Sequence, residues 1–141
     1  MRWVALLVWM TGGCTTDTGA PPGAAACAAA PDFFVSEVYP RYLVPNQCGN
    51  AGCHSFAGGH GVLRLRAPEQ PAPAPGQALD AWPIGWRENY LSTIRLLRCD
   101  APLQSRLLTV PEGQGNLHPP GPVVLDRAGA ASLLQTWVSS P

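Results

Sequence analysis

The chain has 141 residues, which is enough for one folded domain but not for two. Its formal net charge is zero, so no strong field favours binding to nucleic acid or to an anionic membrane surface. Much of the apolar content is alanine and large apolar residues are few, so we expect a domain of this composition to need a staple or a cofactor.

The N-terminal residues, MRWVALLVWMTGGC, contain one arginine, a short apolar run and small residues that end at Cys14. This pattern is typical of a secretory signal, and the apolar run is too short to span a bilayer. The ending TGGC resembles the lipobox of bacterial lipoproteins, in which the cysteine is lipidated and becomes the new N-terminus. The resemblance implies a signal peptide at 1–13 and, since no aspartate follows Cys14, an anchor in the outer membrane. Ordinary signal cleavage nearby, which would leave a soluble periplasmic protein, is the alternative.

Residues 14–31 form a low-complexity segment of small residues and proline. Such a segment cannot bury enough apolar area to order itself, so we interpret it as a flexible tether. The folded domain is then expected at 32–141. Its first helix would begin with Asp32 as the N-cap, bury Phe34 and Val38 on one face, and end or restart at Pro40.

A second feature is the stretch 46–56, NQCGNAGCHSF, which holds two cysteines and an adjacent histidine. The pattern Cys-x-x-Cys-His is typical of haem attachment, in which two thiols bond the haem vinyl groups and the histidine ligates iron. Four residues separate the cysteines here instead of two. Gly49, Asn50 and Gly52 make this longer loop pliable enough to reach both vinyl groups.

The haem interpretation assigns the two thioether bonds to Cys48 and Cys53 and the proximal iron ligand to His54. A tetrahedral zinc set of Cys48, Cys53, His54 and His60 is one alternative. It is weakened because the adjacent Cys53 and His54 would both have to turn toward one small ion. A plain disulfide between Cys48 and Cys53, with His54 incidental, is the other alternative.

Beyond the cysteines, residues 61–76 indicate a short extended piece that continues into a proline-rich loop. Residues 85–99 have the apolar spacing of an amphipathic helix. Its predicted face consists of Trp86, Tyr90, Ile94 and Leu97, with Leu91 beside it. Residues 105–110 indicate a short apolar turn or helix, and residues 113–124 indicate a loop.

The last predicted helix follows Asp126, which we expect to cap it. Its apolar face consists of Leu133, Leu134, Trp137 and Val138. Since no segment alternates apolar and polar residues as a strand would and no internal repeat is present, we predict an all-α fold of helices and long loops.

The chain has five cysteines, and a secreted protein has to account for each thiol. Lipid would take Cys14, and haem would take Cys48 and Cys53. Cys27 and Cys99 would then form a disulfide that fixes the end of the tether to the domain. A Cys48–Cys53 disulfide would leave the same remaining pair, so the number of cysteines does not decide the haem question.

Several further motifs surround the cysteines in a fixed order. They are VYPRYL at 38–43, GVLRL at 61–65, PLQSRLL at 102–108 and HPPGPVVLDRAGAASLLQTWV at 118–138. This order resembles the small c-type cytochrome domains of bacterial lipoproteins over nearly all of 33–138, with 68–85 as an insertion. The resemblance implies a cytochrome c-like helical domain with one haem c. It also implies electron transfer on the periplasmic side of the envelope and a redox protein as the partner.

The resemblance also bears on the second iron ligand, because His118 stands where that family has a methionine. The only methionines, Met1 and Met10, lie in the predicted signal peptide. The remaining imidazoles are His60 and His118. His60 would need a sharp return to reach the opposite haem face, because it lies only six residues after His54. We therefore expect His118 to be the distal ligand, with a surface histidine of no role as the alternative.

Catalytic motifs are absent from the sequence. No Ser-His-Asp order, phosphate-binding loop or pair of carboxylates stands out, and Asp100 and Glu112 are isolated. We therefore expect an electron carrier and not an enzyme, with neither nucleic acid as a partner nor membrane contact other than the lipid. The alternative is a disulfide-stapled envelope lipoprotein with a binding or structural role and no haem.

Overall fold

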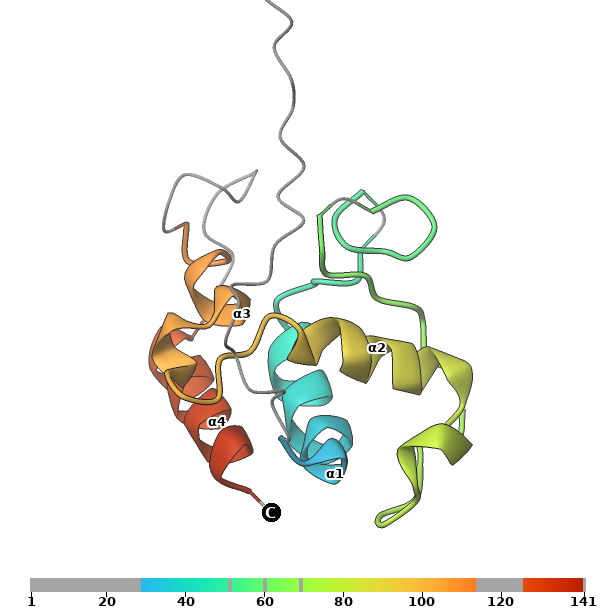
Figure 1. The fold of residues 1–141 in the computed structure, drawn as a ribbon. Helices are drawn as coiled ribbons and strands as arrows, with labels where there is room; N and C mark the ends of the chain where they lie inside the picture. The colour runs from blue at the N-terminus through green and yellow to red at the C-terminus, as the bar shows by residue number, and fades with distance from the viewer. Residues whose placement is uncertain (1–28, 51, 60, 69, 114–125, 141) are drawn as a thin grey trace, which may run out of the picture.

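The computed structural model describes residues 29–50, 52–59, 61–68, 70–113 and 126–140. In this part of the chain, helices pack around one hydrophobic core, and the β-pairing is limited to an isolated parallel bridge between Ser55 and Leu65 (Figure 1). The all-α prediction is therefore confirmed for the described residues. The predicted signal peptide and nearly all of the predicted tether lie outside them.

Helix α1, Pro31–Phe33, begins with a proline, whose missing N–H would have no partner in the first turn. The expectation that Asp32 caps this helix is wrong. Asp32 lies inside the first turn, and the residue before the helix, Ala30, makes no side-chain cap. The Asp32 carboxylate instead accepts a hydrogen bond of 2.7 Å from the N–H of Gly76, which ties the proline-rich loop to the start of the helix.

Helix η1, Phe34–Leu43, continues directly from α1 and passes through Pro40, which we expected to end or restart the helix. The helix is a π-helix, and its last turn is closed by a bond of 3.1 Å from the Val44 N–H to the Tyr39 carbonyl. The wider turn accommodates the proline ring, which would crowd the carbonyl four residues earlier in an α-helix. The buried residues of η1 are Phe34, Val38, Tyr42 and Leu43.

Helix α2, Ile84–Ile94, corresponds to the predicted amphipathic helix. Its buried residues are Gly85, Trp86, Asn89, Tyr90 and Thr93. Trp86 and Tyr90 agree with the prediction, whereas Leu91 is 38% exposed and Leu97 is buried beyond the end of the helix. The predicted face is therefore buried, with Ile94 packed partly buried against the core, but the prediction missed Asn89 and Thr93 because a hydrophobic pattern cannot place polar residues in a core.

The remaining helices are η2 (Leu79–Ala81), η3 (Pro102–Gln104), α3 (Arg106–Thr109) and α4 (Arg127–Ser139). The predicted cap of α4 is confirmed, because the Asp126 carboxylate accepts a bond of 2.9 Å from the Gly129 N–H. Figure 1 shows α4 beside the helix formed by α1 and η1, with α2 crossing the same core.

An aromatic cluster joins these helices. The ring of Phe34 lies 5.6 Å from that of Tyr90 and 5.9 Å from that of Trp137, measured between centroids. Tyr90 and Trp137 also bond the first described residues of the chain. The Tyr90 hydroxyl donates to the Ala29 carbonyl at 2.7 Å, and the Trp137 indole N–H donates to the Ala30 carbonyl at 2.9 Å. Two residues at the end of the predicted tether are therefore buried in the core.

Candidate functional site

The described residues of the cysteine loop, 46–50 and 52–56, stand at one end of the helices (Figure 1). The chain leaves η1 through Gln47, whose positive φ of 54° is uncommon for a residue other than glycine. The next N–H, that of Cys48, donates to the Leu43 carbonyl at 3.0 Å. The first cysteine is therefore attached directly to the end of a buried helix, while the rest of the loop extends from the body.

The two thiols of this loop have different surroundings. Cys48 is 8% exposed and belongs to the hydrophobic core, whereas Cys53 is exposed. Both are free thiols, so the alternative Cys48–Cys53 disulfide is not formed in the structure. Burial raises the pKa of Cys48 to about 11, and the neighbouring Cys53 adds to the rise. At neutral pH Cys48 is therefore a protonated, shielded thiol, and Cys53 is the accessible one.

His54 is half-buried, and the loop fixes its backbone on both sides. Its N–H donates to the Cys48 carbonyl at 3.2 Å, and its carbonyl accepts from the Leu65 N–H at 2.7 Å. A Cβ built on Gly61 would lie 3.6 Å from the Cε1 atom of His54, so a side chain at this position would contact the imidazole. The position of the predicted iron ligand is therefore set by the segment that follows the loop, in addition to the loop itself.

That segment, residues 63–66, is extended, as the sequence predicted. Leu63 and Leu65 are 6% and 3% exposed, so they point into the core. The carbonyl of Leu65 accepts from the Phe56 N–H at 2.8 Å, which with the bond to His54 forms the isolated bridge. The segment therefore acts as a short strand that pairs with residues 54–56.

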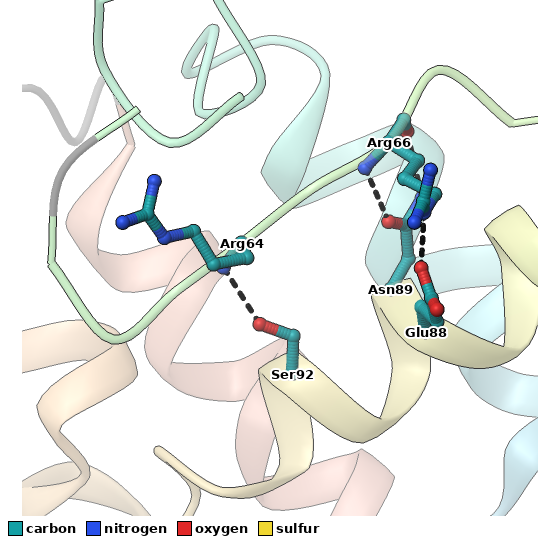
Figure 2. A network of polar contacts seen from close by, with 5 residues as sticks. All are labelled: Arg64, Arg66, Glu88, Asn89 and Ser92. Carbon is teal, nitrogen blue, oxygen red and sulfur yellow. Dashed lines mark hydrogen bonds and ion pairs between the residues drawn. The ribbon is translucent and has the colours of Figure 1, made fainter. Parts of the chain in front are cut away.

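The opposite edge of the same segment is bonded to side chains of α2. Figure 2 shows Asn89 facing the backbone of Arg66 and Ser92 facing the backbone of Arg64. The Arg66 N–H donates to Asn89 Oδ1 at 2.7 Å, and the Asn89 amide donates back to the Arg66 carbonyl at 3.0 Å. The Arg64 N–H donates to the Ser92 hydroxyl at 2.7 Å. Sequence reasoning missed both α2 residues, since nothing in the local pattern shows where a polar side chain finds its partner.

The side chain of Arg66 also connects the two elements. It forms an ion pair with Glu88 on α2, and its guanidinium carbon lies 3.4 Å from the centroid of the Phe56 ring (Figure 2 shows the ion pair). Phe56 is 47% exposed at the end of the cysteine loop. Arg66 thus covers one face of an aromatic ring that the loop presents to solvent.

The motif PLQSRLL, at 102–108, forms η3 and α3 in the structure. Ser105, between these two helices, is fully buried, and its hydroxyl accepts from the Arg98 N–H at 2.8 Å. Leu107 and Leu108 are buried in the core. The motif therefore packs a tight turn against the end of α2. His60 and His118, the two candidates for the distal ligand, both lie outside the described residues.

The structure describes only Cys99 of the two cysteines in the predicted Cys27–Cys99 bridge. Cys99 is disulfide-bonded, and neither Cys48 nor Cys53 is its partner, since both are free. Cys14 and Cys27 lie outside the described residues, so the pairing of Cys99 with Cys27 stays a prediction.

The loop offers two thiols and one imidazole as donors, and zinc and haem are the two groups that could use them. Within the described part of the chain, no three His, Cys, Asp or Glu side chains cluster in a way that could hold a metal ion, and His60, the fourth member of the alternative zinc set, lies outside that part. Haem attachment requires no such cluster, because the thiols bond the periphery of the macrocycle and the imidazole bonds its centre. Two free thiols and an imidazole in one loop fit the chemistry of haem c.

None of the helices in the described residues is long and apolar enough to cross a membrane. No family model, curated protein or solved structure matches the chain.

Proposed function

We propose that this protein carries single electrons through one covalently bound haem c on the periplasmic side of the bacterial envelope. The observation that carries the proposal is the cysteine loop itself: Cys48 and Cys53 are free thiols, and His54 follows them in the same loop with its backbone fixed. In a secreted protein, an oxidising compartment would convert two thiols so close in sequence to a disulfide unless another group bonded them.

Attachment would use the two thiols in the same way. Each S–H would add across one haem vinyl group, so that an S–C bond forms and the hydrogen goes to the other vinyl carbon. No oxidant is required, but both thiols have to be reduced, and the structure forms no disulfide at either. Cys48 would anchor the haem to the core, and Cys53 would bind it at the exposed part of the loop.

His54 would be the proximal iron ligand. The bonds of its backbone to Cys48 and Leu65 limit its movement. Bound haem supplies a reversible one-electron iron couple. The chain would tune this couple through ligand orientation and through the exclusion of water by the core.

The order of the helices supports the finer proposal of a cytochrome c-like domain. The motif VYPRYL lies in η1 before the loop, GVLRL gives the extended segment after it, PLQSRLL gives η3 and α3, and the final motif ends in α4. The predicted lipobox at Cys14 supports a lipid anchor, which the low-complexity tether would separate from the domain. A redox protein of the envelope is the proposed partner.

The decisive experiment is to produce the protein in cells that attach haem, and to stain for haem after denaturing electrophoresis. Mass spectrometry should show the chain plus one haem, and the Soret absorbance should survive denaturation. Cys53→Ala should lose at least one thioether, whereas the matched control Ser55→Ala should retain both. A colourless wild-type protein with a Cys48–Cys53 disulfide would favour the alternative, a stapled lipoprotein without haem.

A further inference from the structure

The extended segment 63–66 is bonded along both of its edges, and the two edges contact different parts of the site. Along one edge, the N–H and carbonyl of Leu65 bond the backbones of His54 and Phe56. Along the other, the backbones of Arg64 and Arg66 bond α2 (Figure 2). The alternation is that of a central strand, in which successive residues direct their backbone groups to opposite neighbours. Here side chains of a helix take the place of the second neighbouring strand.

Asn89 makes this substitution possible because its amide has both an acceptor oxygen and a donor NH2 group, and it uses them on the N–H and carbonyl of Arg66 as a strand residue would. It is fully buried, and both halves of the amide are used on Arg66. Ser92, three residues further along α2, lies on the same face of the helix and accepts the next outward-facing N–H, that of Arg64. A rigid helix of the core is thereby coupled to the segment at two points.

We propose that Asn89, assisted by Ser92, is a positioning residue for His54. The connection runs from the Asn89 amide to Arg66, through the segment to Leu65, and from the Leu65 N–H to the His54 carbonyl. Because α2 belongs to the core, it gives the histidine a fixed reference that the pliable cysteine loop cannot provide. The part of this inference that concerns iron rests on the proposed function, whereas the placement of the loop does not.

Amide hydrogen exchange on the purified full chain tests the placement, whether or not haem is bound. Asn89→Leu should lower the protection of the Leu65 and Phe56 amides about tenfold relative to the amide of Leu134 in α4. The matched control is Thr93→Val, which removes another fully buried polar group of α2, one that bonds only within the helix. It should lower protection at all three amides by the same factor. If Asn89→Leu also lowers the protection of all three amides by the same factor, the proposal is overturned.

Ser92→Ala keeps the test valid if Asn89→Leu does not fold, because Ser92 is only half-buried and contributes a single bond to the segment. It should reduce protection at Leu65 selectively, and unchanged protection there would count against the proposal.

In haem-loaded protein, the midpoint potential should shift in Asn89→Leu and stay unchanged in Thr93→Val. Equal midpoint potentials in the two variants would show that Asn89 does not position His54. A colourless protein would refute the proposed function, and the exchange measurement would still decide the placement of the loop.

Discussion

The hydroxyl of Tyr42 donates a hydrogen bond to the carbonyl of Leu107, 65 positions further along the chain. Both residues are 2% exposed, and the bond joins η1, the helix that leads into the cysteine loop, to α3. Burial raises the pKa of Tyr42 above its ordinary value, and the neighbouring Cys48 and Glu112 add to the rise. The hydroxyl therefore stays protonated, and the bond persists, throughout the range in which the protein would work.

Tyr42→Phe should lower the free energy of unfolding by about 1–3 kcal/mol, because it leaves the buried Leu107 carbonyl without its donor. Urea unfolding followed by circular dichroism would measure the change. The matched control is Tyr39→Phe, which removes a hydroxyl from a half-buried tyrosine of the same helix and should cost less than about 0.5 kcal/mol. Equal losses of unfolding free energy in the two variants would show that the bond to Leu107 adds no stability of its own.

The two thiols of haem-free protein should react at different rates with iodoacetamide. The thiolate is the nucleophile, and at pH 8 a thiol with a pKa of about 11, as for Cys48, is ionised to only about one part in a thousand. Burial slows its reaction further. Cys53 should therefore be alkylated first, and the rate at Cys48 should keep rising up to about pH 11. Peptide mass spectrometry after timed quenching would separate the two, and similar rates at pH 8 would contradict the burial of Cys48.

The raised pKa of Cys48 also makes stability depend on pH. The unfolded chain loses this proton near the ordinary value of 9.0, while the folded chain keeps it to about 11. The folded state therefore binds more protons in this window, and the contribution of Cys48 to stability falls as pH rises through it. Cys48→Ala should remove that part of the pH dependence, and an unchanged profile would argue against it.

The cap of α4 allows a test of the C-terminal helix. Asp126→Ala should destabilise the fold by about 1 kcal/mol, because the Gly129 N–H loses its acceptor. Gly129→Ala would usually stabilise a helix, but here the added Cβ would meet the Asp126 carboxylate. We therefore expect Gly129→Ala to be destabilising alone and stabilising in the presence of Asp126→Ala. Additive effects in the double variant, measured by thermal unfolding, would contradict this coupling.

Local signals predicted one of the two expected helix caps: the Asp32 cap was wrong, and the Asp126 cap was correct. Asp126 caps α4 as expected, since an N-cap bonds an N–H only three residues away. The passage of η1 through Pro40 could not be predicted, because the rule for proline describes an α-helix and η1 is a π-helix. Asn89 escaped detection because its partner, Arg66, lies 23 positions earlier in the chain.

For the candidate site, the sequence proposed Cys48, Cys53 and His54 because they lie within seven positions of one another in the chain. It could not show that Cys48 belongs to the core and Cys53 to the surface, since burial is set by helices distant in sequence. Nor could it show that His54 is tied to Leu65, because a single bridge leaves no alternating pattern to detect. The supports of the site are therefore structural findings, while its ligands are sequence predictions.

The lipid anchor is open to a fractionation experiment. Because TGGC resembles a lipobox, wild-type protein should appear with the membranes, and Cys14→Ala should not. Cys99→Ala is a suitable control, since it removes a cysteine without affecting lipidation and should leave the protein with the membranes. Equal solubility of wild type and Cys14→Ala would remove the anchor from the proposal.

The last prediction concerns the second iron ligand, which sets much of the chemistry once His54 is fixed on the other side. Methionine opposite histidine raises the potential of a cytochrome, but no methionine follows Met10, inside the predicted signal peptide. Ligation by His118 would give a six-coordinate, low-spin haem with a lower potential. Pro119 and Pro120 would restrict the chain that presents the imidazole and so reduce the entropy lost on ligation.

Optical spectroscopy of the haem-loaded ferric protein tests this assignment. His118→Ala should convert a low-spin spectrum to high-spin and allow carbon monoxide to bind the reduced form readily, whereas the control His60→Ala should leave the spectrum unchanged. If the wild-type spectrum is already high-spin, the iron has an open side, and the binding of small gases becomes the better account of the haem. A change in His60→Ala alone would transfer the ligand role to His60.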